Sequence, residues 1–268
     1  MDPLSEPAFT LRPGDTPLLV SLPHAGTWLP DELVQRLAEP ARALPDTDWH
    51  LERIYAFAAE LGAGLIVPRA SRYLVDLNRP PDDGPMYAGA NNTGLCPLRG
   101  FDGAPLYRAA EPDAAEVRAR LERWWRPYHE ALAGELARLR ARFGHAILWD
   151  GHSIRSELPW LFDGRLPDLN LGTADGTSCA PALRGALAQA LAAQGEFSHV
   201  VDGRFKGGYI TRHYGSPAAG VHAVQLEMCW STYMAEQPPY AIDPARAARL
   251  EPVLRALLRV ALDWRPDG

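Results

Sequence analysis

The chain has 268 residues, of which 22% are charged and 47% hydrophobic, and its formal net charge is -6. This composition predicts a globular protein with a large buried core and excludes a disordered or fibrous chain. No basic stripe indicates a nucleic-acid partner, and no apolar run approaches the roughly 18 residues of a membrane span.

Strand-like apolar runs alternate with stretches of helical spacing along the first part of the chain. An apolar strand is predicted over 17–22, and a helix over 49–61, where apolar residues share one face and Gly62 ends the pattern. Two short strands, GLIVPRA and YLVDLN, are predicted within 64–78. The segment from Arg79 to about Pro112 is rich in Pro, Gly and Asn and has no regular period. A loop this long in a compact domain is usually functional or disordered, and the sequence leaves open whether it forms a lid.

The second part of the chain continues this alternation. A spacing near 3.6 residues predicts a helix from Pro112 to Phe143, ended by Gly144, which Pro127 should kink or split. The remaining predicted elements are a strand at 145–152, a helix at 181–193, strands at 198–203 and 221–228, and a helix at 243–264. Length alone would also allow two small domains. The alternation favours one α/β domain over residues 1–268, with three layers in which helices cover both faces of a mixed or largely parallel sheet.

The start of the chain and the cysteines favour a cytoplasmic protein. Residues 1–15 are acidic and contain prolines, without the positively charged start and apolar core of a secretory signal. Cys96, Cys179 and Cys229 are odd in number and far apart, so we expect a reducing compartment and no disulfide framework. The sequence carries no indication of an oligomeric state.

Polar side chains stand at the ends of several predicted strands. His24 follows the first strand, Asp76 and Asn78 close another, and Asp150 and His152 end the strand at 145–152. The carboxyl ends of strands in an open α/β sheet meet at one crevice, so we expect these groups to converge. Two histidines with one or two carboxylates are the ligand set of a catalytic metal that keeps one position open. The sequence therefore predicts a site for Zn²⁺, or another divalent metal, that includes both histidines.

The third ligand has two candidates. Asp46 and Asp48 stand at the start of the helix predicted at 49–61, where either could instead be the N-cap. A lone histidine is often structural, and this interpretation stays open for His24 and His152 when each is taken alone. Considered together, the two histidines favour a metal site in which Asp48 is the third ligand. Asp150 is expected to orient the His152 ring from behind, because the glycine between them permits close backbone approach.

Glu227 lies among apolar residues in the strand predicted at 221–228. A carboxylate buried in a strand is costly unless it is paired or coordinated. If it faces a water molecule at the metal, it can act as a general base with a pKa set by its surroundings. The alternative is a partner for a buried arginine.

Cationic residues form the remaining group. Guanidinium groups bind carboxylates in a bidentate manner, so such a group suits a small-molecule substrate with one or more carboxylates. Solvated surface charge is the alternative. Our first choices for substrate binding are Arg79 and Arg212, and the reserves are Arg155, Lys206 and His213. Asn78, next to Arg79, is a further substrate-binding candidate, and Arg204 is a cation of the same glycine-punctuated loop as Lys206.

Five stretches of the chain form an ordered set. They are LPHAGTWLP, DTDWHLERIY, SRYLVDLNRP, LWDGHSIRSELPWLFDGRLPDLNLGT and GRFKGGYITRHYGSPAAGVHAVQLEMCWSTYM. They lie between about residues 17 and 234, and the combination is far more specific than any single stretch. Together they resemble the N-formylglutamate amidohydrolases, the deformylases of histidine degradation.

The resemblance implies a phosphorylase/hydrolase-like α/β domain, related in fold to zinc-dependent exopeptidases and muramoyl-alanine amidases. It implies His24, Asp48 and His152 as metal ligands, with Asp48 where related amidases often have Glu, and Glu227 as the catalytic glutamate. The implied reaction converts N-formyl-L-glutamate, a dicarboxylate, to L-glutamate and formate. Glu227 would move a proton from water to the departing amine. Two alternatives remain open: a related zinc hydrolase of another N-acyl amino acid or peptide, and a non-catalytic binder of acidic metabolites.

Overall fold

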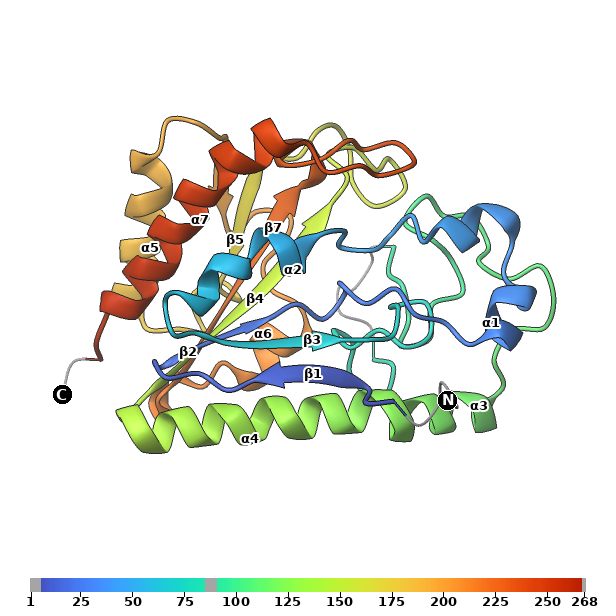
Figure 1. Cartoon of the computed structure of the whole chain (residues 1–268), viewed down its shortest axis with the longest axis horizontal. Coiled ribbons are helices and arrows are strands. Elements are labelled where there is room, and N and C mark those ends of the chain that lie inside the picture. The colour runs from blue at the N-terminus through green and yellow to red at the C-terminus, as the bar shows by residue number, and fades with distance from the viewer. Residues whose placement is uncertain (1–5, 85–90, 267–268) are drawn as a thin grey trace.

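The centre of the protein is a seven-stranded sheet, seen in a computed structural model that describes residues 6–84 and 91–266 (Figure 1). Its strands are β1 (Phe9–Arg12), β2 (Leu18–Ser21), β3 (Gly64–Pro68), β4 (Ala146–Ile154), β5 (Leu169–Gly172), β6 (His199–Val201) and β7 (Val221–Cys229). They lie in the order β1-β3-β2-β4-β7-β5-β6. β3, β2, β4 and β7 run parallel, whereas β1 is antiparallel to β3 and β5 is antiparallel to β7. The predicted mixed sheet is confirmed.

Helices cover both faces of this sheet (Figure 1). One face packs against α2 (Leu51–Ile54), α5 (Pro181–Ala193) and α7 (Pro244–Asp263), and the other against α4 (Arg126–Phe143) and α6 (Tyr209–Tyr214). The core on this second face extends past the ends of the strands to α1 (Asp31–Arg36) and α3 (Ala114–Arg120). Val20 and Trp149 belong to the first core, and their neighbours Leu19 and Leu148 to the second. Apolar residues therefore follow one another without alternation, as expected for strands buried on both faces. Within the two described ranges, none of the helices has the length and apolar character needed to cross a membrane.

The helix predicted from Pro112 is interrupted ahead of Pro127. α3 passes into one π-helical turn at Leu121–Trp125, and α4 follows with Pro127 in its first turn. Proline has no N–H to donate and its ring clashes with the preceding turn, so the wider π turn accommodates it. Gly144 ends α4 with a φ of 81°, in the left-handed region that favours glycine.

Two predicted elements differ from the structure. The helix expected at 49–61 is split at Tyr55 into α2 and a 3₁₀ turn at Ala56–Ala59. YLVDLN is buried but forms no strand. Ser71 Oγ accepts a hydrogen bond from the Tyr73 N–H, and Asp76 Oδ1 accepts one from the Asn78 N–H. These local side-chain acceptors replace a strand ladder, so the segment turns.

The irregular segment predicted from Arg79 to Pro112 is confirmed for its described part. Residues 79–84 and 91–112 contain isolated bridges but no helix or strand. Other short 3₁₀ turns lie at Glu39–Ala43, Pro217–Ala219 and Trp230–Thr232.

Candidate active site

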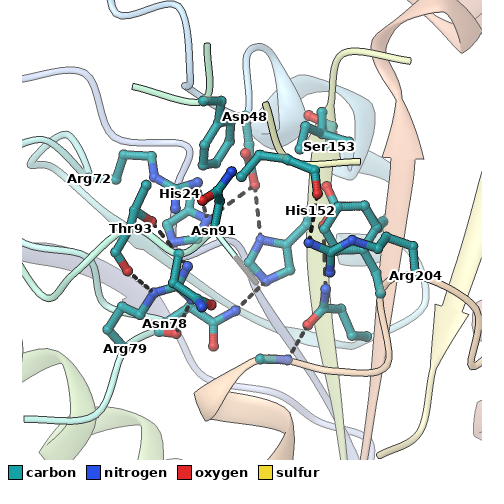
Figure 2. A pocket seen from close by; sticks show the side chains of 18 residues that line it. His24, Asp48, Arg72, Asn78, Arg79, Asn91, Thr93, His152, Ser153 and Arg204 are labelled. Carbon is teal, nitrogen blue, oxygen red and sulfur yellow. Dashed lines mark hydrogen bonds and ion pairs between the residues drawn. The ribbon is translucent and has the colours of Figure 1, made fainter. Parts of the chain in front are cut away.

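Three buried side chains meet at the carboxyl ends of β2 and β4 (Figure 2). His24 follows β2, Asp48 precedes α2, and His152 lies near the end of β4; they are 4%, 2% and 2% exposed. The Asp48 N–H donates to the His24 carbonyl oxygen at 3.1 Å, which fixes these two segments together. Asp48 Oδ2 lies 3.1 Å from His152 Nδ1 and 3.7 Å from His24 Nδ1.

These distances and donor types fit a divalent metal. One ligand atom from each residue lies within 4.8 Å of the other two. Ligand atoms of a tetrahedral zinc with bonds near 2.0–2.2 Å stand roughly 3.3–3.5 Å apart, so small shifts would complete the set. The three residues can therefore hold a metal ion.

The second nitrogen of each histidine faces a carboxylate. His24 Nε2 is 2.7 Å from Asp76 Oδ1, and His152 Nε2 is 3.1 Å from Asp150 Oδ2. Such partners orient a metal-ligating ring and leave its other nitrogen for the metal. Asn78 Nδ2 also lies 3.1 Å from His152 Nε2, and the Asn78 Oδ1 accepts from the Ile210 N–H.

The electrostatic surroundings of the two histidines differ. Burial lowers the pKa of His24, and the nearby Arg72 guanidinium lowers it further. Burial also opposes charge on His152, but the carboxylates of Asp150 and Asp48 raise its pKa well above the usual value. The carboxylates around His152 therefore favour positive charge at the centre of the cluster.

Asp46 and Asp48 have different partners, and neither caps α2. Asp46 Oδ2 accepts from the Tyr73 hydroxyl at 2.7 Å and from the Phe101 N–H at 2.9 Å. α2 begins after His50, which makes no side-chain capping bond. The N-cap interpretation is wrong, and Asp48 is the aspartate that joins the two histidines.

Glu227 lies beside the cluster on the neighbouring strand. β4 and β7 pair with His152 opposite Glu227 and Asp150 opposite Gln225. Gln225 Nε2 donates to Glu227 Oε2 at 3.3 Å, and its Oε1 accepts from the Gly208 N–H at 2.7 Å. Burial raises the pKa of Glu227 to about 8. Among residues 6–84 and 91–266, no ion pair joins Glu227 to an arginine, which speaks against the alternative of a buried arginine partner.

An open cavity lies against these residues. His24, Asp48, His152 and Glu227 line it, together with Asn78. Its further lining includes three arginines, Arg72, Arg79 and Arg204, the loop residues Asn91, Asn92 and Thr93, and the apolar side chains of Phe101, Leu161 and Phe205. The carboxylate-rich centre is thus surrounded by cations and an apolar wall.

Four of the predicted cations are not among the residues that line this cavity. α6 buries Ile210 and Thr211, so its next residues, Arg212 and His213, are exposed. Lys206 forms an ion pair with Asp175 at 2.8 Å. Arg155 donates to the Tyr240 hydroxyl at 3.2 Å and lies over the Trp230 ring. The structure brings Arg79 and Asn78 to the cavity, but not these four.

Two arginines of the cavity were not chosen from the sequence. Arg72 lies in a buried stretch four residues before Asp76, with which it pairs, and this spacing of opposite charges among apolar residues was an available signal. Arg204 belongs to the cationic group of the sequence, but not to the residues predicted to bind the substrate. The Arg204 Cζ lies 5.4 Å from the centre of the Phe205 ring, which also lines the cavity, whereas Lys206 pairs with Asp175.

Comparisons with known proteins identify the family of the chain. A family model described as N-formylglutamate amidohydrolase matches residues 16–234. N-formylglutamate deformylases of Pseudomonas aeruginosa and Pseudomonas putida are 54% and 51% identical over 257 residues, which are 96% of this chain and 96% of each relative. A crystal structure of N-formylglutamate amidohydrolase from Ralstonia eutropha has a TM-score of 0.80 and 27% identity, covering 96% of this chain and 98% of that one. The fold and the resemblance predicted from the sequence are confirmed: the chain belongs to the N-formylglutamate amidohydrolase family.

Proposed function

We propose that the protein hydrolyses N-formyl-L-glutamate to L-glutamate and formate, as the last step of a histidine degradation pathway. One observation carries the proposal: a His24, Asp48 and His152 cluster and a buried Glu227 share a cavity with arginines. A metal hydrolase of an acidic amide needs these groups together. The named activity of the two Pseudomonas relatives supports the choice of substrate.

His24, Asp48 and His152 are the proposed ligands of a divalent metal. Zn²⁺ is the first choice because two imidazoles and a carboxylate suit it. When bound, the metal would lower the pKa of a water molecule toward about 7 and polarise the formyl group. Asp76 and Asp150 hold the histidine rings from behind.

Glu227 moves the proton in this reaction. It takes a proton from water as the water oxygen adds to the formyl carbon. It then gives that proton to the amine nitrogen as the C–N bond breaks. Burial raises its pKa above the usual value of a glutamate, which favours a group that serves first as base and then as acid.

Arg79 and Arg204 bind the two substrate carboxylates in this proposal. Arg79 donates from Nε to the Thr93 carbonyl oxygen at 2.7 Å, and Arg204 donates from Nη2 to the Leu161 carbonyl oxygen at 3.1 Å. These bonds restrict both side chains. Figure 2 shows the two guanidinium groups on opposite sides of the His24, Asp48 and His152 cluster. A dicarboxylate can therefore span the cavity with its formyl group at the cluster, and Asn78 contributes a polar contact next to Arg79.

Formate release from N-formyl-L-glutamate tests this function. The purified protein should release equal amounts of formate and glutamate, and Glu227→Gln should lower turnover by roughly 10²-fold or more while metal content stays unchanged. Glu135→Gln is a matched control, because Glu135 is also buried but pairs with Arg138 on α4 and does not line the cavity. Absence of formate release by the metal-loaded protein, or full turnover by Glu227→Gln, would overturn the proposal.

A further inference from the structure

Arg72 is a buried cation at the edge of the cavity with two different acceptors. It is 4% exposed and lines the cavity beside His24. Its Nη2 donates to Asp76 Oδ2 at 2.5 Å, and its Nη1 lies 3.2 Å from His24 Nδ1. Its Cζ lies 4.4 Å from the centre of the Phe101 ring. The guanidinium is therefore held on one edge by Asp76 and on one face by an aromatic ring.

The bond from Arg72 to His24 determines which nitrogen of His24 carries the proton. A guanidinium can only donate, so Nδ1 must accept and carries a lone pair. The ring proton is then on Nε2, which faces Asp76 Oδ1 at 2.7 Å. Nδ1 is also the nitrogen that faces Asp48 Oδ2, and it is the proposed metal ligand. One lone pair cannot serve both the Arg72 N–H and a metal ion.

The guanidinium loses one acceptor once Nδ1 coordinates a metal. Its contacts with Asp76 and Phe101 do not involve Nδ1, so they keep the group in place. The Nη1 donor then remains beside His24, on the cavity side, without its former partner. A buried donor that loses its acceptor is costly, so this position favours an oxygen acceptor supplied by the substrate.

We propose that Arg72 is a catalytic residue that donates a hydrogen bond to the formyl oxygen as negative charge develops on it. This role rests on the proposed hydrolysis of N-formyl-L-glutamate. A donor that is fixed and buried before the reaction stabilises such charge more strongly than water does, because it need not reorganise. Arg72 suits this task better than it suits binding a substrate carboxylate, since Asp76 already balances its charge.

The bond changes follow from the proposed reaction. The water oxygen forms a bond to the formyl carbon, the π pair of the C=O bond moves onto its oxygen, and the water proton passes to Glu227. Arg72 keeps all of its protons and only donates a hydrogen bond to the negative oxygen. The C=O bond then re-forms, the C–N bond breaks, and the nitrogen receives the proton from Glu227.

If Arg72 only positioned the His24 ring, its replacement would weaken metal binding. Two variants distinguish this positioning role from the proposed catalytic role. Asp76→Asn removes the charge partner of Arg72 and weakens the support of the His24 ring, so metal affinity should fall by roughly 10- to 100-fold. Arg72→Lys retains a positive charge near Asp76, but an ammonium lacks the planar fork that reaches Asp76 and the formyl oxygen together. Metal affinity of Arg72→Lys should therefore stay close to that of the wild type.

Three measurements test the proposal: the metal dissociation constant by chelator competition, kcat and KM, and calorimetric affinity for N-phosphono-L-glutamate and L-glutamate. In N-phosphono-L-glutamate a tetrahedral phosphoryl group replaces the planar formyl group. Arg72→Lys should lower kcat by roughly 10²-fold or more, the scale for loss of one oxyanion donor, with KM little changed. Arg72→Lys should also lower the ratio of the affinity for N-phosphono-L-glutamate to the affinity for L-glutamate by a similar factor.

Full kcat in Arg72→Lys, or a loss of metal affinity as large as in Asp76→Asn, would overturn this role. If Arg72→Lys does not fold, the double variant Arg72→Gln, Asp76→Asn removes both buried charges and the same comparison is made against Asp76→Asn alone. Equal kcat in these two proteins would then contradict the proposal. A wild-type enzyme that releases no formate would instead overturn the proposed function itself.

Discussion

At the residue scale, both histidines of the candidate metal site are held by the ring nitrogen that does not face Asp48. His24 and His152 each present one nitrogen to Asp48 and the other to a further aspartate. The backbone contributes as well: a Cβ on Gly151 would lie 2.8 Å from Leu22 Cδ2, so a larger residue would have to displace the Leu22 side chain from this part of β4. Positions set in this way lower the reorganisation that binding and catalysis require.

The choice of carboxylate-binding arginines leads to a prediction at this scale. Arg79→Met and Arg204→Met should each raise KM for N-formyl-L-glutamate. The fall in kcat/KM should correspond to a loss of binding free energy on the order of 2 to 5 kcal/mol, the range for a charged hydrogen bond in a site without water. The arginine that binds the side-chain carboxylate should also discriminate against N-formyl-L-glutamine, because a buried charge left unpaired is costly. Its variant should process the two substrates at more similar rates.

Arg212→Met is the informative comparison, because Arg212 was a first choice from the sequence but does not line the cavity. Its steady-state constants should match those of the wild type. A raised KM in Arg212→Met together with normal constants in Arg204→Met would contradict the assignment.

At the scale of elements, α4 and α6 are joined to the buried segment that carries Asn78. His129 on α4 lies with Nε2 2.9 Å from the Leu77 carbonyl oxygen and Nδ1 2.9 Å from the Tyr214 hydroxyl of α6. Its ring stacks on Trp125 with 3.7 Å between centroids. Leu77 immediately precedes Asn78, so this histidine supports the floor of the site from the helix layer.

The pKa of His129 makes the free energy of unfolding depend on pH. Burial lowers the pKa of His129 from 6.5 to about 4. The unfolded chain therefore binds a proton at this position between about pH 6.5 and 4 when the folded chain does not, and the free energy of unfolding falls as pH falls through that window. Its full contribution is present above about pH 6.5. Between pH 7.5 and 5 the loss should be about 2 kcal/mol, since one pKa unit corresponds to about 1.36 kcal/mol.

Urea denaturation of the metal-free protein at pH 7.5 and pH 5 measures this effect. His129→Gln has no titrating group at this position, so its free energy of unfolding should fall less between the two pH values than that of the wild type. An equal fall in both proteins would show that His129 is not the source of the acid sensitivity.

At the scale of the whole molecule, the sequence predicted the elements whose side chains follow a clear period. β2 and the first residues of β4 are continuous apolar runs because both of their faces are buried, β7 is buried and rich in apolar residues, and α5 and α7 have apolar residues at helical spacing. β1, a four-residue edge strand with half-exposed alternating positions, offers no comparable apolar run. YLVDLN has strand-like residues, but it turns because Ser71 Oγ and Asp76 Oδ1 accept local N–H bonds and because the Asp76 N–H donates to the distant Leu95 carbonyl oxygen.

The candidate site could be predicted in part for the same reason. Groups that follow strand ends, such as His24 and His152, are brought together by the parallel sheet itself. The cations lie on loops and on α6, where orientation depends on tertiary contacts that no local period records. Arg204 and Arg212 are both close to glycines in the sequence, yet only Arg204 lines the cavity.

The metal content of the protein and its variants shows whether His24, Asp48 and His152 form the metal site of a hydrolase. Elemental analysis of the purified, metal-loaded wild type should find about one divalent metal per chain, as three protein ligands of this type predict. The double variant His24→Ala, His152→Ala should retain none, and Asp48→Ala should lose metal when the matched variant Asp46→Ala does not. Full metal occupancy in the double variant would show that these residues do not hold the metal.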